Sequence, residues 1–332
     1  MADLHEACGL AAVQLHGPLN KHPLGGAAYY LHRMLLQQQN RGQVSAGIST
    51  FNSERDQLIK TRVGLGLVND VFRANHPPKN KAILKNFAGR SGIGHVRYAT
   101  CGIDGKEYAM PFERVHGRKW KWFSFAYNGN LANFVELRRE LENAKYHVIR
   151  NVDSEVIMHH IAKQFIGEKR QDFKAAFSKL ARIFDGAYNL VYLNAEEVLL
   201  GVRDPVGFKP LSYASNGEKI MMASETSAYS NQGIERIRDV QPGEMVLVQN
   251  GNISVKRFAK SKRIARCMFE WVYFANVSSV LDGKPVYDVR TNLGRELARI
   301  ETEAVGNDHI VVGVPDTATP AAAAMALSRI HI

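Results

Sequence analysis

The sequence is poor in cysteine, and its few cysteines lie far apart. Of its 332 residues only Cys8, Cys101 and Cys267 are cysteine, and no two of them form a Cys-x-x-Cys pair. Disulfide-stabilised secreted domains and zinc knuckles need closely spaced cysteine pairs, so this pattern argues against both classes. A free thiol in such a chain is most often a buried structural residue.

Long apolar runs and an export signal are also missing. No apolar run approaches the roughly 20 residues that a membrane-spanning helix needs. Residues 1–7 are too short and too acidic for a secretory signal peptide. We therefore expect a cytoplasmic protein with no membrane partner.

Acidic residues are outnumbered, and the net charge of +11 would suit an anionic partner. The Lys and Arg residues are scattered, however, and no motif that reads nucleic acid accompanies them. The densest basic cluster, within residues 114–122, is typical of a solvated loop that runs into a strand. A small phosphorylated substrate would explain the positive charge equally well. Because no motif that reads nucleic acid is present, we expect no nucleic-acid partner.

The remaining composition is that of a globular protein, with 45% hydrophobic and 23% charged residues. The length suffices for one large or two ordinary domains. Apolar periodicity predicts helices over residues 27–39, 132–145, 154–165 and 173–184. It predicts strands over residues 10–15, 46–51, 58–63, 92–100, 123–127, 188–193, 198–202, 220–223, 245–248 and 253–258. This order of strands, helices and strands favours sheets layered with helices over a repeating βαβ pattern.

Two short polar segments have ordinary structural interpretations. Asn128-Gly129 follows a predicted strand, and Asn-Gly is the commonest sequence of a tight turn, so a hairpin is expected there. Asp153 precedes a predicted helix, where an N-cap is the expected role.

The pattern changes after residue 260. A basic linker over residues 260–266 leads into a predicted strand over 267–274 and a helix over 288–303. A strand over 309–314, a polar loop and an alanine-rich helix follow, as at the start of an α/β domain whose loop could hold an anion. One such unit cannot complete a doubly wound sheet, so we expect an incomplete second domain.

Cys8, followed by Gly9 and the apolar run 10–15, admits two interpretations. It is a buried structural thiol, or it is a nucleophile that becomes the first residue once residues 1–7 are removed. In the second case its own α-amine, which titrates at about 7.7–8.0, acts as the general base.

Several motifs, taken together and in order, resemble the class II glutamine amidotransferase domain. They are Cys8-Gly9-Leu10, Asn40-Arg41-Gly42-Gln43, Gly94-His95-Val96-Arg97-Tyr98-Ala99-Thr100, Tyr127-Asn128-Gly129-Asn130-Leu131 and Asp153-Ser154-Glu155. Further segments resemble the amidophosphoribosyltransferase family, which acts in purine synthesis. These are residues 203–211, 223–226, 241–244, 267–274 and 314–317.

The resemblance implies an α+β fold with three parts. Residues 1–7 would be a cleaved leader and residues 8–259 an N-terminal-nucleophile hydrolase sandwich with αββα layers. Residues 260–332 would be the first part of an α/β phosphoribosyltransferase-like domain.

The resemblance also implies roles at the site. Cys8 would attack the side-chain amide of glutamine, while Asn128 and the backbone of Gly129 would form the oxyanion hole. The four substrate-binding residues would be Arg41, Arg97, Tyr98 and Asp153. Arg97 would hold the substrate carboxylate and Asp153 the substrate ammonium group.

Some departures from the family pattern bear on this expectation. Asn40 stands where the family usually has His, and Ala275-Asn276-Val277-Ser278-Ser279 replaces the usual Ala-Arg-Pro-Asp-Ser. The family's phosphoribosyl pyrophosphate loop and its flexible catalytic loop are not found in the 332 residues.

The implied partners are glutamine, phosphoribosyl pyrophosphate only if the missing domain is supplied, and further copies of the chain in a homo-oligomer. We expect no cofactor for glutamine hydrolysis and Mg²⁺ for the transferase step of the full family enzyme. An iron–sulfur cluster cannot be judged from Cys267 alone.

Two alternatives stay open from the sequence. One is a non-catalytic regulatory paralogue whose leader is retained, since an uncleaved leader ties the Cys8 nitrogen into an amide with no basic lone pair. The other is an N-terminal-nucleophile hydrolase acting on a different amide.

Overall fold

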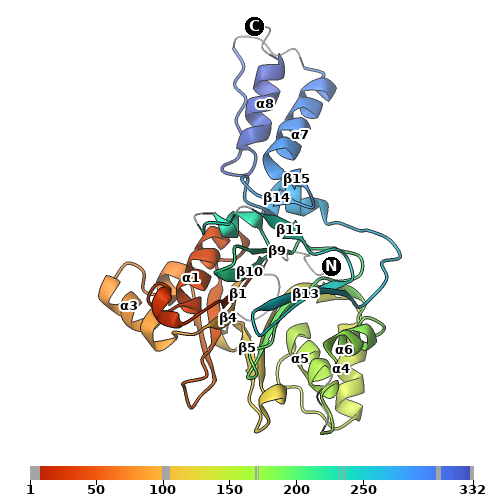
Figure 1. The fold of residues 1–332 in the computed structure, drawn as a ribbon. Coiled ribbons are helices and arrows are strands. Elements are labelled where there is room, and N and C mark those ends of the chain that lie inside the picture. Colours follow the sequence, from red (N-terminus) through yellow and green to blue (C-terminus); the bar gives the residue numbers. More distant parts are fainter. Residues whose placement is uncertain are drawn as a thin grey trace.

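Two β-sheets stacked face to face form the body of the molecule (Figure 1). The computed structural model describes residues 8–98, 105–168, 170, 172–230, 232–234, 236–303 and 308–329. The first sheet has seven strands in the order β11-β9-β10-β1-β4-β2-β3. Their bounds are β1 (Gly9–Leu15), β2 (Ser45–Phe51), β3 (Ile59–Leu65), β4 (Ser91–Arg97), β9 (Ser212–Ser215), β10 (Lys219–Ala223) and β11 (Ile237–Asp239).

The second sheet has six strands in the order β13-β12-β8-β7-β6-β5, and all its pairings are antiparallel. Their bounds are β5 (Phe112–Arg114), β6 (Phe123–Leu131), β7 (Gly186–Asn194), β8 (Leu199–Val202), β12 (Glu244–Gln249) and β13 (Asn252–Arg257).

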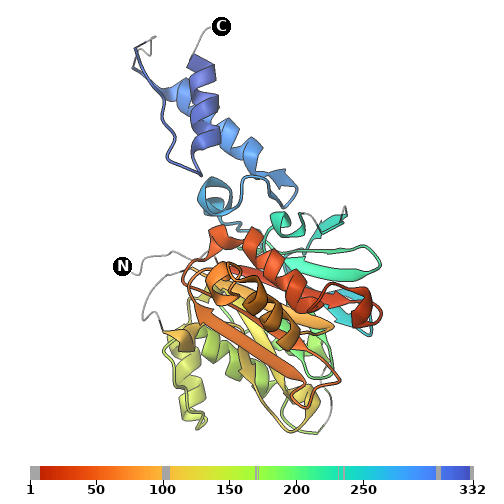
Figure 2. The same ribbon diagram turned by 90° about the vertical axis from the view of Figure 1, so that its left-hand side faces the viewer.

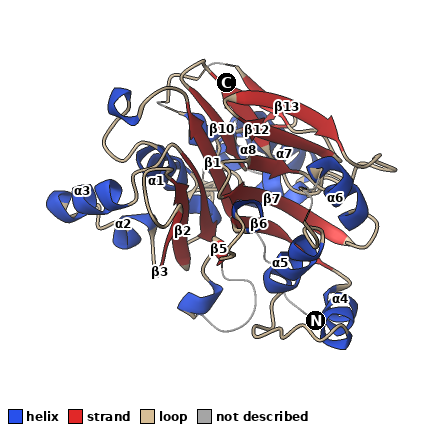
Figure 3. Ribbon diagram, turned by 60° about the horizontal axis from the view of Figure 1, so that its bottom comes forward, coloured by secondary structure: helices blue, strands red, loops and turns tan. Residues whose placement is uncertain are grey.

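Helices cover the outer side of each sheet (Figure 3). The first sheet carries α1 (Ala27–Gln37), α2 (Val68–Val71) and α3 (Pro77–Asn86), and the second carries α4 (Phe134–Asn143), α5 (Asp153–Lys163) and α6 (Phe173–Leu180). The predicted α+β fold with αββα layers is therefore confirmed. The sequence pattern had not indicated α2, α3, β5, β9 or β11.

Strand β1 shows how the sequence positions the layers. All seven of its residues are buried, and successive side chains point to opposite faces. Leu10 and Ala12 join the core between the sheets, whereas Ala11, Val13 and Leu15 join the core beneath α1. Because both faces of β1 are covered, its sequence is an apolar run without regular alternation of polar residues.

The predicted turn at Asn128-Gly129 is wrong. Strand β6 continues through both residues to Leu131, and they pair with Asn189 and Tyr188 of β7. Gly129 has φ +155°, and a Cβ atom there would lie 2.0 Å from the carbonyl oxygen of Ala187. The glycine therefore permits a close approach of two strands instead of a turn.

The C-terminal part stands at one end of the sandwich (Figure 2). It contains a π-helix (Glu270–Phe274), the hairpin β14 (Val280–Leu281) and β15 (Lys284–Pro285), and the packed pair α7 (Val286–Ile300) and α8 (Thr319–Arg329). The domain boundary near residue 260 stays a prediction.

Two strand predictions in this part are wrong. Residues 270–274 form the π-helix, and Arg290 of α7 donates to the carbonyl oxygens of Trp271 and Ala275. Residues 309–314 form no strand, and no described strand lies beside them to pair with.

Candidate active site

Cys8 lies immediately before β1, at the end of the first sheet where β4 finishes. Gly9 of β1 pairs with Val96 of β4, so the neighbouring residues Cys8 and Arg97 lie at the same end of the sheet. The backbone of Leu10 is anchored by Ser224, whose hydroxyl accepts from Leu10 N–H at 3.0 Å. Cys8 itself is half-buried.

Arg97, the last residue of β4, is the strongest candidate for binding an anionic group. Its side chain is 8% exposed, and its Nη1 has no hydrogen-bond partner among the described residues. The guanidinium carbon lies 5.6 Å from the ring centre of Tyr108. A buried guanidinium group with a free donor suits a carboxylate, which it can bind through two parallel hydrogen bonds.

Arg41 is next to Cys8 but its guanidinium group is already occupied. Its Nε donates to the Cys8 carbonyl oxygen at 3.1 Å. The two terminal nitrogens bind the carboxylates of Glu225 and Glu270 at 2.8–2.9 Å. The structure thus places the predicted substrate-binding residue Arg41 beside the nucleophile, bound to protein carboxylates.

Asn128 is fully buried, and neither atom of its side-chain amide has a hydrogen-bond partner within the described part of the chain. A buried amide without hydrogen-bond partners destabilises the fold unless a ligand supplies those hydrogen bonds. The neighbouring Gly129 brings the backbone of β6 close to β7. This pair can supply the donors of an oxyanion hole.

Asp153 is the first residue of α5, and its N-cap is Val152, so the predicted capping role is wrong. Its Oδ2 lies 3.1 Å from the Tyr127 hydroxyl and accepts from Leu131 N–H at 3.3 Å. Burial raises the pKa of Asp153, and these two hydrogen bonds oppose that rise. A half-buried carboxylate at this position can bind an ammonium group.

His95 joins the two sheets at the site, a role that the sequence motif alone did not reveal. Its Nε2 donates to the Tyr127 carbonyl oxygen at 3.1 Å, one residue before Asn128. Burial lowers the pKa of His95 to about 3, so the ring is neutral at physiological pH. The β4 end that carries Arg97 is thereby held against the β6 segment that carries Asn128.

Tyr98 directly follows β4. Its ring packs edge-on against Phe274 of the π-helix, with ring centres 6.3 Å apart. Burial raises the pKa of its hydroxyl, with a further contribution from Tyr273. Residues 1–7 and 99–104 lie outside the described residues, so the leader and the rest of the Tyr98 motif are not placed.

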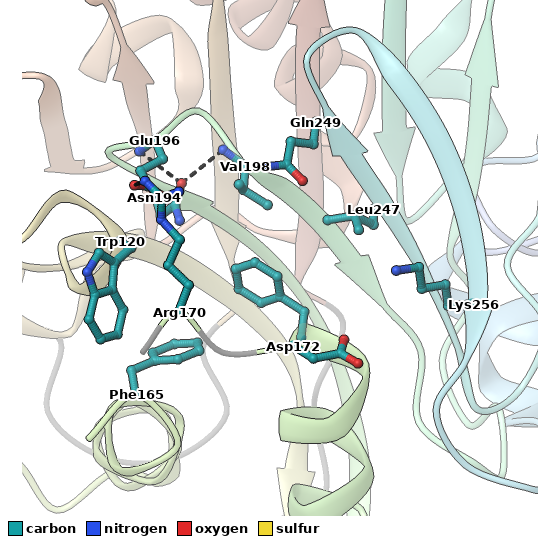
Figure 4. A pocket seen from close by; sticks show the side chains of 11 residues that line it. Trp120, Phe165, Arg170, Asp172, Asn194, Glu196, Val198, Leu247, Gln249 and Lys256 are labelled. Carbon is teal, nitrogen blue, oxygen red and sulfur yellow. Dashed lines mark hydrogen bonds and ion pairs between the residues drawn. The ribbon is translucent and has the colours of Figure 1, made fainter. Parts of the chain in front are cut away.

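A cavity of about 220 Å³ lies elsewhere, between α6 and the second sheet (Figure 4). Its lining includes Trp120, Phe173 and Lys256, and none of the predicted site residues. Arg170 binds Glu196 there, and Asn194 accepts from two backbone N–H groups. Several of its polar groups are therefore paired within the chain.

Among the described residues, no group of three or more His, Cys, Asp or Glu side chains is arranged to hold a metal ion. The Mg²⁺ of the transferase step stays a prediction. No helix within the described ranges is both long enough and apolar enough to cross a membrane.

Comparison with known proteins gives the site a family context. A family model described as a glutamine amidotransferase domain matches residues 96–231. The amidophosphoribosyltransferase of Methanothermobacter thermautotrophicus is 38% identical over 97% of this chain and 63% of its own length. That of Archaeoglobus fulgidus is 38% identical over 91% of this chain and 62% of its own length.

Solved structures agree. The glutamine phosphoribosylpyrophosphate amidotransferase from B. subtilis, complexed with ADP and GMP, matches at 30% identity with a TM-score of 0.80, over 97% of this chain and 64% of that one. A structure described as the allosteric regulatory enzyme of purine biosynthesis matches with a TM-score of 0.81. The chain spans about three fifths of the length of these relatives. Residues 96–231 are therefore similar to a glutamine amidotransferase domain, and nearly the whole chain is similar to about three fifths of the length of the amidophosphoribosyltransferases that it matches.

Proposed function

We propose that the chain is the glutaminase part of an amidophosphoribosyltransferase-type enzyme, with Cys8 as its nucleophile once residues 1–7 are removed. One observation carries the proposal. Arg97, whose Nη1 is unpartnered among the described residues, lies at the end of β4 that pairs with the start of β1 after Cys8. His95 of β4 binds the carbonyl oxygen of Tyr127, the residue before Asn128, whose amide is also unpartnered within that part of the chain. Buried donors at the end of the sheet that carries Cys8 suit a substrate that has both a carboxylate and an amide.

The proposed reaction converts glutamine and water into glutamate and ammonia. The Cys8 thiol gives its proton to the free α-amine, and the sulfur attacks the side-chain amide carbon. Asn128 and the Gly129 N–H donate to the developing oxyanion. The intermediate collapses to a thioester as the amine returns the proton to the departing ammonia. Water then attacks the thioester, aided by the same amine, and glutamate leaves with the thiol restored.

Two further residues select an α-amino acid in this proposal. Arg97 binds the substrate α-carboxylate, and Asp153 binds the α-ammonium group. Both contacts lie on the part of glutamine that does not react, so they orient the amide toward Cys8. An amide without these two charged groups would lose both contacts, which argues against a hydrolase acting on a different amide.

The relatives' names suggest where the ammonia goes. We propose phosphoribosyl pyrophosphate as its acceptor, within purine synthesis, with Mg²⁺ supporting that second step. The chain spans about three fifths of the length of those relatives. Glutamine hydrolysis is therefore the part of the reaction that we assign to this chain's own residues.

The test is glutamate release from glutamine by the purified chain. Cys8→Ala should abolish release, whereas Cys267→Ala should retain it, because Cys267 lies on the segment before the π-helix. Equal activity in the wild type and Cys8→Ala would contradict the proposal. No release from protein that still carries residues 1–7 would favour the non-catalytic paralogue.

A further inference from the structure

We infer that Glu270, on the π-helix outside the sandwich, is a positioning residue for Cys8 and acts through Arg41. The inference rests on the proposed function, since it assigns a residue that holds the same nucleophile in place. Glu270 is 229 residues away from Arg41 in sequence, so no local motif joins the two.

The geometry is a continuous chain of contacts from the π-helix to the nucleophile. Glu270 binds Arg41 through both carboxylate oxygens, at 2.8 Å to Nη1 and 2.9 Å to Nη2. The third nitrogen of Arg41, Nε, donates to the Cys8 carbonyl oxygen at 3.1 Å. A planar guanidinium group gripped on two nitrogens can rotate little, so the direction of its third donor is fixed.

The cluster is buried and balanced in charge. The side chains of Arg41, Glu225 and Glu270 are 0% exposed, and Lys209 lies 3.2 Å from Glu270. Burial alone would raise the pKa of Glu270, but Arg41 and Lys209 outweigh it and the pKa is lowered. The cluster thus holds two cations and two anions.

Other contacts hold the π-helix in place without Glu270. Asn40 donates to the carbonyl oxygen of Phe274 and to Glu225, each at 2.9 Å. Arg290 of α7 donates to the carbonyl oxygens of Trp271 and Ala275 at 2.8 Å. A substitution at Glu270 should therefore release Arg41 while the helix stays docked.

The segment that departs from the family pattern also serves this cluster. Glu225 accepts from Asn276 N–H at 2.7 Å and from the Ser279 hydroxyl at 2.9 Å. These bonds fix the second carboxylate on Arg41. Positioning of Cys8 thus draws on residues from both sides of the predicted domain boundary.

Loss of the Glu270 charge has two consequences for Cys8. Arg41 keeps Glu225 as its charged partner and at most one bond to the glutamine oxygen in place of the two to Glu270, so the donor to the Cys8 carbonyl oxygen loses its fixed direction. The cluster also gains one net positive charge, with Lys209 and Arg41 facing Glu225 alone and Arg290 nearby on α7. Positive charge favours thiolate over thiol and amine over ammonium, so both groups at Cys8 should titrate at lower pH.

The experiment compares Glu270→Gln with the wild type as the processed full chain. The kcat for glutamate release should fall about 10- to 100-fold, as for a lost charge-assisted hydrogen bond, with the KM for glutamine within about threefold. In an Arg41→Gln background, Glu270→Gln should cause no further loss. Glu296→Gln, which removes an exposed carboxylate on α7, serves as the control and should leave kcat unchanged.

A charge-balanced variant separates positioning from folding. Lys209→Gln with Glu270→Gln keeps one cation and one anion, so it should fold and still show the lower kcat. The pH midpoint for alkylation of Cys8, read by peptide mass, should fall in Glu270→Gln but not in this double variant. A wild-type kcat in Glu270→Gln, or additive losses with Arg41→Gln, would overturn the inference.

The outcome also distinguishes the two proposals. If neither protein releases glutamate, the proposed function fails, and the alkylation of Cys8 alone decides the inference. A midpoint that is the same in the wild type and in Glu270→Gln would then reject Glu270 as a positioning residue.

Discussion

At the scale of single residues, the site is defined by buried polar groups that lack a partner in the described chain. Arg97 and Asn128 both have such atoms, whereas Arg41 and Asp153 have theirs bound. The sequence motifs named all four residues without separating these two kinds. Arg41 is occupied because it binds Glu225 and Glu270, which lie 184 and 229 residues away in the sequence. Contacts across such separations cannot be predicted from local spacing.

Arg97→Lys tests the geometry of the carboxylate site. Lys keeps the charge but presents no planar pair of donors, so kcat/KM for glutamine should fall about 10- to 100-fold, mainly through KM. Steady-state glutamate release measures this. Arg118→Lys, at an exposed arginine, should match the wild type. A loss confined to kcat would argue against substrate binding by Arg97.

His95 should make stability depend on pH. Its pKa is lowered to about 3, so between about pH 6.5 and 3 the unfolded chain binds a proton that the native state does not. The free energy of unfolding should therefore fall as pH falls through this range, with His95 contributing about 1.4 kcal/mol per pH unit. Denaturant titrations at pH 6 and pH 5 give the change in the free energy of unfolding per pH unit. For His95→Gln this change should be smaller than for the wild type by about 1.4 kcal/mol. The exposed His147→Gln should keep the wild-type slope, and an unchanged slope in His95→Gln would refute the assignment.

At the scale of elements, sequence patterns predicted helices and strands well where periodicity was strong. The helices at 27–37, 153–163 and 173–180 and the strand at 9–15 all formed near their predicted positions. Asn128-Gly129 misled the prediction because Asn-Gly has two uses, a turn or a close strand approach, and only the neighbouring β7 decides between them.

Gly129→Ala tests the close approach of β6 and β7. The added Cβ would lie 2.0 Å from the Ala187 carbonyl oxygen, so the strands must separate. We expect a loss of about 2 kcal/mol or more in the free energy of unfolding, together with loss of glutamate release. Gly117→Ala has open space around the new methyl group and should be neutral in both measurements. A stable, active Gly129→Ala would contradict the role of this glycine.

At the scale of the whole molecule, a buried ion pair joins the C-terminal part to the sandwich. Arg203, after β8, binds both oxygens of Asp282 at 2.7 and 2.9 Å, and Arg266 adds a further contact at 2.9 Å. Asp282 lies in the turn between β14 and β15. The sequence indicated a linker at 260–266 but could not indicate this pair, which joins positions 79 residues apart.

Asp282→Asn should weaken the attachment of the C-terminal part to the sandwich. It removes the charged partner that binds both terminal nitrogens of the buried Arg203, and breaking a buried ion pair typically costs about 3–5 kcal/mol. Limited trypsin digestion should then cut faster within the basic stretch 260–266. Asp56→Asn, at an exposed carboxylate, should be cut at the wild-type rate. Equal rates of trypsin cleavage for Asp282→Asn and the wild type would show that other contacts attach the C-terminal part to the sandwich.

The measurement that tests the central claim most directly is the intact mass of the purified protein, taken with glutamate release from the same sample. The account predicts a chain that starts at Cys8 and releases glutamate, and the loss of release in Cys8→Ala. A full-length mass in a sample that releases glutamate would contradict the claim, because Cys8 would then have no free amine to act as its base.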